Sequence, residues 1–145
     1  MKRFALALSA FAIIATAAYA DPIEDRQNFM KQNGRLLGAL GPMAKGEQPF
    51  DAAPAMAMLQ AFNEHSQTLD VATMFPEGSD EGDTRASPKI WEDMAGFQAA
   101  VDKFKADASA AAGSNPQDVE ALQAAMGAIG ANCGSCHETY RLSRD

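Results

Sequence analysis

The chain has 145 residues, and its 12 Lys and Arg side chains are outnumbered by 19 Asp and Glu, which gives a formal net charge of -7. Proteins that bind nucleic acid or anionic lipid need a basic surface, so this charge balance argues against both kinds of partner. A chain of this length has room for one domain with a hydrophobic core.

The first twenty residues have the pattern of a cleaved secretory signal peptide. They begin with two basic residues, continue with an apolar run over residues 4–18, and end in the small-x-small sequence Ala18-Tyr19-Ala20. The alternative is an uncleaved membrane anchor, but the apolar run is short for a bilayer span of roughly 20 residues. We therefore expect cleavage after Ala20, a working domain of residues 21–145, and export into an oxidising compartment.

Two helices are predicted in the first half of this domain. The first covers about residues 23–40, where apolar side chains recur at helical spacing, and Gly41-Pro42 is expected to end it. Asp51 is a suitable N-cap for a second helix that runs to about Thr73. The polar, acidic segment 75–87 predicts a connecting loop.

A third and a fourth helix follow, each opened by a capping residue and a proline, Ser87-Pro88 and Asn115-Pro116. The third has an apolar seam at alternating spacings of four and three: Ile90, Met94, Phe97, Val101, Phe104 and Ala108. The fourth has a similar seam: Val119, Leu122, Met126, Ile129, Cys133, Cys136 and Tyr140. Such seams face a shared core, and short connections favour antiparallel neighbours. The sequence thus predicts an all-α protein, an antiparallel up-down-up-down four-helix bundle.

The fourth seam contains the only two cysteines of the chain, Cys133 and Cys136, and His137 follows directly in the sequence CGSCH. Cys-x-x-Cys-His is the attachment motif of c-type haem. The two thiols form thioether bonds to the haem vinyl groups, and the histidine supplies an imidazole nitrogen as an axial ligand of the iron. The motif predicts one haem c, bound covalently through both cysteines, with its iron held by His137.

Three other roles of the cysteine pair fit the pattern less well. A disulfide between Cys133 and Cys136 would close a very short loop and would stabilise the fold little. A thiol-disulfide enzyme has its reactive thiol at a helix N-terminus, whereas this pair lies deep within the fourth helix. Zinc needs about four ligands, and the only other histidine, His65, belongs to the second helix.

The second axial position of the iron lies across the haem plane. In the predicted topology, the C-terminal end of the fourth helix is level with Met30, Met74 and Met94. Met94 belongs to the apolar seam of the third helix, where a packing role is expected, and Met74 precedes a helix-ending Phe-Pro. Met30, on the buried face of the first helix, is therefore the favoured methionine.

The segments RQNFMKQNG, AKGEQPFD, SPKIWED and CGSCHETYR resemble the class II c-type cytochromes, the cytochrome c prime family. The resemblance extends over essentially all of residues 21–145 and is closer to the low-spin branch than to the high-spin, five-coordinate cytochromes c prime. It implies a first-helix methionine as sixth iron ligand, which is Met30 in this chain. High-spin members also carry apolar residues at this place, methionine included, without a bond to iron.

Arg26 and Arg141 match family arginines that lie near the haem propionates. Arg26 is one helical turn before Met30, and Arg141 is one turn after His137. Guanidinium groups pair well with carboxylates, so the resemblance implies that both arginines bind propionate. The alternative is that both are solvated charges at helix ends.

The resemblance implies a periplasmic electron-transfer protein, not an enzyme, whose iron alternates between the ferrous and ferric states. One alternative is a high-spin cytochrome c prime that binds nitric oxide or carbon monoxide at an open distal site. A thiol-disulfide enzyme without haem is a third hypothesis. A basic redox protein would suit the acidic surface as a partner, and relatives are often homodimers through their first two helices.

Overall fold

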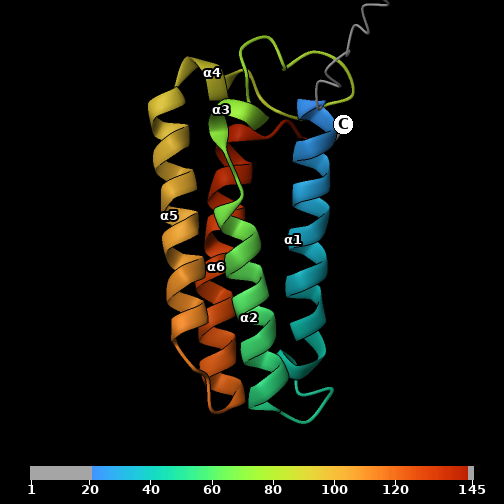
Figure 1. Ribbon diagram of the computed structural model, residues 1–145, viewed down its shortest axis with the longest axis vertical. Helices are drawn as coiled ribbons and strands as arrows, with labels where there is room; N and C mark the ends of the chain where they lie inside the picture. Colours follow the sequence, from blue (N-terminus) through green and yellow to red (C-terminus); the bar gives the residue numbers. More distant parts are fainter. Residues whose placement is uncertain (1–20, 144–145) are drawn as a thin grey trace, which may run out of the picture.

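The computed structural model describes residues 21–143 as four long and two short helices (Figure 1). They are α1 (Pro22–Ala44), α2 (Ala52–Gln67), α3 (Val71–Met74), α4 (Lys89–Glu92), α5 (Met94–Gly113) and α6 (Val119–Tyr140). The chain descends along α1, returns along α2, descends along α5 and returns along α6, so the predicted up-down-up-down bundle is confirmed. The expected signal peptide, residues 1–20, lies outside the described residues.

Aspartate side chains cap five of these six helices. The carboxylates of Asp21, Asp51, Asp70, Asp93 and Asp118 each accept a hydrogen bond from a backbone N–H of the first helical turn. A carboxylate there satisfies an otherwise unpaired donor and interacts favourably with the positive end of the helix dipole. Part of the acidic excess of the chain is therefore a set of helix caps, including the one predicted at Asp51.

The first helix does not end at Gly41-Pro42, as the sequence indicates, but continues to Ala44. The extra turn places Met43 beside Leu40 in the core, where both side chains are buried. Burial of a large apolar side chain contributes about 1.5–3 kcal/mol. Burial of Met43 is thus comparable to the roughly 3 kcal/mol that a proline costs inside a helix.

The predicted second helix is divided into α2 and α3. Thr68 Oγ1 donates to the His65 carbonyl oxygen over 2.7 Å, and this bond closes the last turn of α2. Asp70 then starts α3, with its carboxylate 2.8 Å from the Ala72 amide nitrogen. Hydrogen bonds from such side chains to nearby backbone groups compete with the backbone hydrogen bonds of the helix. They end α2 earlier than the apolar pattern predicts.

The predicted third and fourth helices also differ at their starts. Ser87 accepts a hydrogen bond from the first residue of α4 as expected, but Asp93 interrupts the helix and caps α5. The fourth helix starts after Asp118 and not at Asn115-Pro116. Asn115 has a left-handed φ of 47°, which asparagine tolerates better than most residues, and it turns the chain into α6.

The core consists of two clusters, one toward each end of the bundle. The lower cluster in Figure 1 includes Leu40, Leu59, Phe62, Leu122 and Ile129. The upper cluster lies where α3 and α4 cover the bundle and includes Phe29, Leu69, Phe75, Phe97 and Tyr140. Phe104 packs against both clusters, so the core is continuous along α5.

The four long helices are not equally close to one another. Packing is extensive between α2 and α5, between α5 and α6 and between α1 and α2, but it is sparse between α1 and α6. A bundle whose first and last helices are only loosely in contact leaves room for a bound group between them. The candidate site lies where α1 and α6 are only loosely packed.

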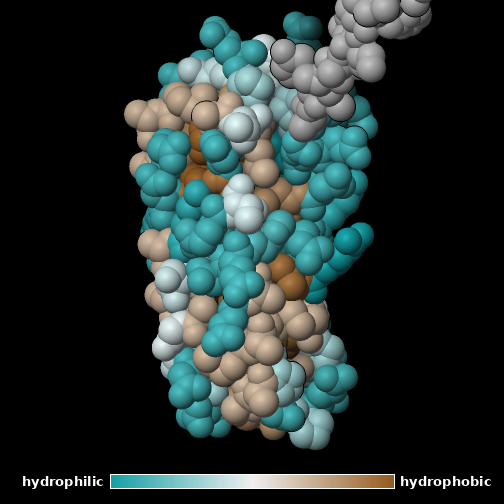
Figure 2. All heavy atoms as spheres, viewed as in Figure 1, coloured by the Kyte–Doolittle hydropathy of each residue, from teal (hydrophilic) through white to brown (hydrophobic). Residues whose placement is uncertain are grey.

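The surface in the view of Figure 1 is mainly hydrophilic in its upper half (Figure 2). Paler hydrophobic residues gather lower down, over α2. Among residues 21–143, none of the helices has the length and apolar character that a membrane crossing requires.

Candidate functional site

A cavity of about 530 Å³ lies at the upper end of the bundle, with walls from α1, α5 and α6 and from the loop before α4. Much of its wall is apolar, and these side chains are Ile23, Leu69, Phe75, Ile90, Phe97 and Val101. Ligand sites in proteins typically combine such an apolar wall with a few polar groups. Here the polar and sulfur-bearing groups come from Arg26, Met30, Arg85, Cys136 and His137.

The two cysteines lie on the inner side of α6, and neither forms a disulfide. Cys136 lines the cavity and packs against the upper core cluster, while Cys133, one turn earlier, packs against the lower cluster. Burial raises the pKa of both thiols, and Cys133 raises that of Cys136 further. A thiol-disulfide enzyme needs an easily formed thiolate, so this environment is unfavourable for that hypothesis.

His137 follows Cys136 on α6 and also lines the cavity. Burial lowers the pKa of His137, and the positive charges of Arg141 and Arg85 lower it further. The neutral imidazole is therefore favoured, and a neutral ring nitrogen is the form that binds a metal. In the part of the chain that the structure describes, no three His, Cys, Asp or Glu side chains gather as metal ligands, so zinc finds no ligand set there.

The three methionines considered from the sequence lie in different places. Met30, on α1, lines the same cavity as His137. The sequence predicts it on the buried face of this helix, but it is 39% exposed, a high fraction for a large apolar side chain. Met74 lines a separate hollow beside His65, and Met94 packs against the upper core cluster. Of the three, Met30 is the one that shares a cavity with His137.

Arg26 is buried, with 6% of its surface exposed, and is not a solvated helix-end charge. Its guanidinium donates to the backbone oxygens of Met74 and Ser79 over 2.9 and 2.7 Å. It also donates to the hydroxyls of Ser79 and Thr84 over 2.8 and 3.1 Å, and it lies over the Phe75 ring. Burial lowers its pKa. Arg26 thus lies at the cavity wall and ties α1 to the acidic loop.

Arg141 lies just beyond α6 in extended backbone and is exposed at the cavity. The chain at 85–87 runs antiparallel to it: the Ser87 amide donates to the Tyr140 carbonyl and the Leu142 amide to the Arg85 carbonyl. The Arg85 side chain also donates to the Leu142 carbonyl. This pairing brings Arg85 to the cavity as a third arginine beside Arg26 and Arg141. The sequence analysis did not single out Arg85, because it lies in a loop without periodicity.

A haem fits these residues. The two cysteines and the imidazole come from one helix, and apolar side chains make up much of the cavity wall. Arg26, Arg85 and Arg141 also line the cavity, and guanidinium groups would suit the carboxylates of a haem. The apolar and sulfur-rich lining suits a porphyrin ring, and the neutral His137 suits iron. Fold and site together define a haem-binding four-helix bundle.

Comparison with known proteins agrees with this class. The family model described as Cytochrome C' matches residues 21–141. A cytochrome c-556 of Agrobacterium fabrum is 37% identical over 145 residues, covering 99% of this chain and 97% of that protein. The solved cytochrome c' of Rhodopseudomonas palustris is 38% identical, with a TM-score of 0.77 and coverage of 87% and 99% of the two chains. Cytochrome c prime of Shewanella frigidimarina is 33% identical with the same TM-score, covering 85% and 95%.

The chain belongs to the cytochrome c' family. Proteins of this family bind haem c covalently and act as haem carriers or gas binders, not as enzymes. The cysteines that such attachment needs are present at positions 133 and 136. The family resemblance inferred from the sequence is thereby confirmed, whereas the assignment to the low-spin branch stays a prediction.

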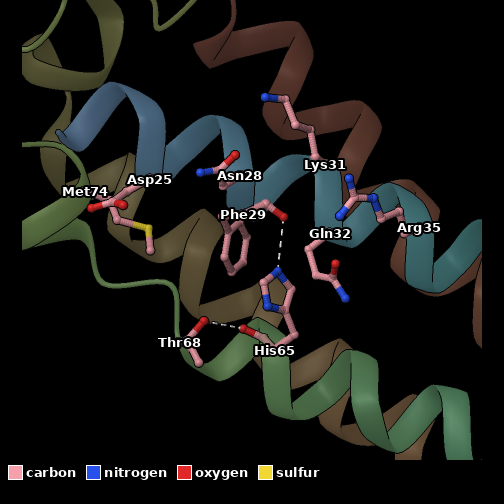
Figure 3. Close-up of a pocket in the computed structure, with 9 residues that line it drawn as sticks. All are labelled: Asp25, Asn28, Phe29, Lys31, Gln32, Arg35, His65, Thr68 and Met74. Carbon is pink, nitrogen blue, oxygen red and sulfur yellow. Dashed lines mark hydrogen bonds between the residues drawn. The ribbon is translucent and has the colours of Figure 1, made fainter. Parts of the chain in front are cut away.

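A second hollow lies on the other side of α1, between α1, α2 and α3 (Figure 3). It is lined by His65, Phe29 and Met74 together with polar residues of α1, among them Gln32 and Arg35. His65, expected from the sequence to pack or to be partly exposed, points toward α1 and bonds to its backbone. The sequence contained one signal for this contact between α2 and α1, namely that His65 is a lone histidine near the inner face of its helix.

Proposed function

We propose that the protein carries one haem c on α6 and transfers single electrons, with His137 and Met30 on the two sides of the iron. The observation that carries this proposal is that Met30 and His137 line one cavity from different helices, and that Met30 is 39% exposed and not part of either core cluster. When bound, the haem supplies an iron that gains and loses one electron.

Each residue of the site has a defined task in this proposal. Cys133 and Cys136 attach the group to α6, and His137 offers its neutral ring nitrogen. The Met30 thioether favours ferrous iron and raises the reduction potential relative to two histidine ligands. Arg141 and Arg26 are proposed to neutralise the propionates, although the guanidinium of Arg26 already makes four hydrogen bonds, one to Met74 at the end of α3 and three to the loop that follows.

A gas-binding protein with an open distal side is the second candidate, and the comparisons favour it. The solved relatives reported above are named cytochromes c', and high-spin, five-coordinate iron is what the resemblance implies for those proteins. In this case Met30 would only narrow the space in which nitric oxide or carbon monoxide binds. The two candidates differ in whether the sulfur of Met30 binds the iron.

The visible absorption spectrum of the ferrous protein distinguishes them. Ligation by Met30 predicts sharp low-spin bands that carbon monoxide changes little, and it predicts that Met30→Ala becomes high-spin and reacts readily with carbon monoxide. Met126→Ala is a matched control, because Met126 packs against the lower core cluster away from the cavity. A high-spin wild-type spectrum supports the gas-binding candidate, and a low-spin spectrum that Met30→Ala leaves unchanged refutes Met30 as the ligand.

We also propose export to the periplasm, with cleavage after Ala20 and a domain of residues 21–145. The position of Asp21 supports this, because the residue after the proposed cleavage site is the cap of α1. Redox proteins with a basic surface are the proposed partners, and a homodimer through α1 and α2 is compatible with the family. Mass spectrometry of the exported protein should give a chain that starts at Asp21 and carries one haem; an uncleaved chain contradicts the proposal.

A further inference from the structure

His65 lies in the last part of α2 and faces α1 (Figure 3). Its Nε2–H donates to the backbone carbonyl oxygen of Phe29 over 3.1 Å. Its ring also stacks on the Phe29 ring, with 4.4 Å between the centroids and 23° between the planes. His65 therefore holds one residue of α1 through both its backbone and its side chain.

The residue that follows Phe29 is Met30. Phe29 is 3% exposed and lines the hollow shared with His65, whereas Met30 lines the cavity shared with His137. The two hollows thus meet α1 at adjacent residues. A constraint on the Phe29 carbonyl acts on the peptide group that joins it to Met30.

The Phe29 carbonyl has capacity for this additional bond. A carbonyl oxygen has two lone pairs, so it can accept from His65 as well as from the helical N–H one turn later, at Asn33. The extra bond comes from a different helix and fixes α1 relative to α2. Such a contact matters here because α1 packs sparsely against α6, so its position at the cavity depends on α2.

The Met30 side chain has little else to hold it. Its sulfur is 3.9 Å from Asn33 Nδ2, a weak contact within the same helix. A side chain that is 39% exposed has few packing partners of its own. Its placement therefore depends on the backbone that carries it.

We propose that His65 is a positioning residue for Met30: by binding the Phe29 carbonyl, it holds α1 so that the Met30 side chain stays at the cavity shared with His137. The inference rests on the proposed function, in which the Met30 sulfur is the iron ligand opposite His137. His65 itself touches neither the cavity nor His137.

Three variants of the haem-loaded protein test the inference. His65→Phe keeps an aromatic ring to stack on Phe29 but lacks the donor, and His65→Gln keeps an N–H donor. Ser66→Ala is the matched control, because the two hydrogen bonds of its hydroxyl, to the Asn63 carbonyl and from the Gln67 side chain, both lie within α2 and neither reaches α1. His65→Leu, which also lacks the donor, replaces His65→Phe if that variant does not accumulate.

The first readout is the carbon monoxide concentration that half-saturates the ferrous protein, because carbon monoxide competes with Met30. Loss of one hydrogen bond that favours the ligated position should make His65→Phe bind carbon monoxide about three- to tenfold more tightly. His65→Gln and Ser66→Ala should both stay within about twofold of the wild type. Equal changes in His65→Phe and Ser66→Ala overturn the positioning role.

The second readout is the nuclear magnetic resonance of the Met30 methyl group in the ferrous protein saturated with carbon monoxide, assigned by its loss in Met30→Ala. Its frequency depends on the position of the methyl group over the haem ring, whether or not the sulfur binds iron. We expect it to move in His65→Phe and to return toward the wild-type position in His65→Gln. A resonance unchanged in His65→Phe overturns the inference.

The two readouts separate this inference from the proposed function. If the wild type binds carbon monoxide as readily as Met30→Ala, ligation by Met30 is refuted, and the methyl resonance alone decides the role of His65. If Met30 does bind iron but neither readout responds to His65→Phe, the proposed function stands and the inference about His65 falls.

Discussion

Arg26 illustrates how a single residue acts in this protein. The sequence predicts either a propionate partner or a solvated charge, yet the side chain is buried and donates to backbone and hydroxyl oxygens at the end of α3 and in the loop between α3 and α4. Its partners lie about fifty residues further along the chain, so no local pattern could identify them. The propionate role stays a prediction.

Replacement of Arg26 by alanine should destabilise the protein by about 2–4 kcal/mol, because it leaves several buried acceptors without a donor. Denaturant unfolding of the holoprotein measures the effect. Arg35→Ala is the control, because Arg35 is exposed on the same helix, and its removal should cost less than about 0.5 kcal/mol. If Arg26→Ala is as stable as Arg35→Ala, the bonds to the loop do not hold α1 in place.

For the cysteines, His137 and Met30, the sequence predicted more of the site than it did for Arg26. The attachment motif is visible in five consecutive residues, since the thiols and the imidazole that it brings together come from one helix. Which methionine lies opposite depends on the packing of another helix. The sequence narrowed the choice to three methionines and ranked Met30 first, and the structure places Met30 in the cavity of His137.

At the scale of elements, capping residues and prolines predicted a helix end correctly where the atoms that decide it lie within a few residues. Asp51 starts α2 because its own carboxylate reaches an amide two residues on. The prediction was wrong at Pro42, because α1 continues to Ala44 and buries Met43 in the core. It was also wrong at Asp93, where the predicted third helix is divided into α4 and α5. Tertiary contacts overrode the local preference at the first of these positions, and a side-chain cap interrupted an otherwise regular apolar seam at the second.

Contacts between elements also include polar pairs. Asn132 on α6 donates to Asp107 on α5 over 2.6 Å, and Lys103 pairs with the same carboxylate from one turn away. The bond from Asn132, followed by that from Lys103, lowers the pKa of Asp107. The ionised carboxylate is therefore stabilised more in the folded protein than in the unfolded chain.

This linkage predicts a pH dependence. A carboxyl with a lowered folded pKa contributes stability that is fully present above its unfolded value of about 3.9 and is lost as the pH falls through the folded value. The difference in unfolding free energy between the wild type and Asp107→Asn should therefore be constant above about pH 5 and shrink below about pH 4. The same comparison in an Asn132→Ala background should show a smaller change; an equal change there means that Asn132 is not the cause.

At the scale of the whole molecule, the bundle is open along one side. The sparse contact between α1 and α6 coincides with the apolar cavity. The faces of these two helices that line the cavity are therefore available to a cofactor. A group that binds the folded state and not the unfolded chain stabilises the fold. Fold stability and haem attachment should therefore be coupled.

The exported double variant Cys133→Ser/Cys136→Ser should carry no covalently bound haem and should unfold at a lower temperature than the wild type, because the cavity between α1 and α6 then lacks a permanently bound group. Thermal unfolding followed by far-ultraviolet circular dichroism measures the difference. The double variant Ser109→Ala/Ser114→Ala serves as a control for two exchanges at exposed positions away from the cavity wall. Equal midpoints for the cysteine variant and the wild type contradict the coupling.

The sequence by itself determined the helical class, the order of the four long helices and the haem-attachment motif, because each depends on residues within a few positions of one another. The tertiary structure decided that Arg26 is a buried tie to the loop, that α1 continues past Pro42, that Met30 is the methionine in the cavity of His137, and that His65 holds the Phe29 carbonyl. These depend on side chains from separate helices meeting in space, and spacing along the chain does not fix such contacts.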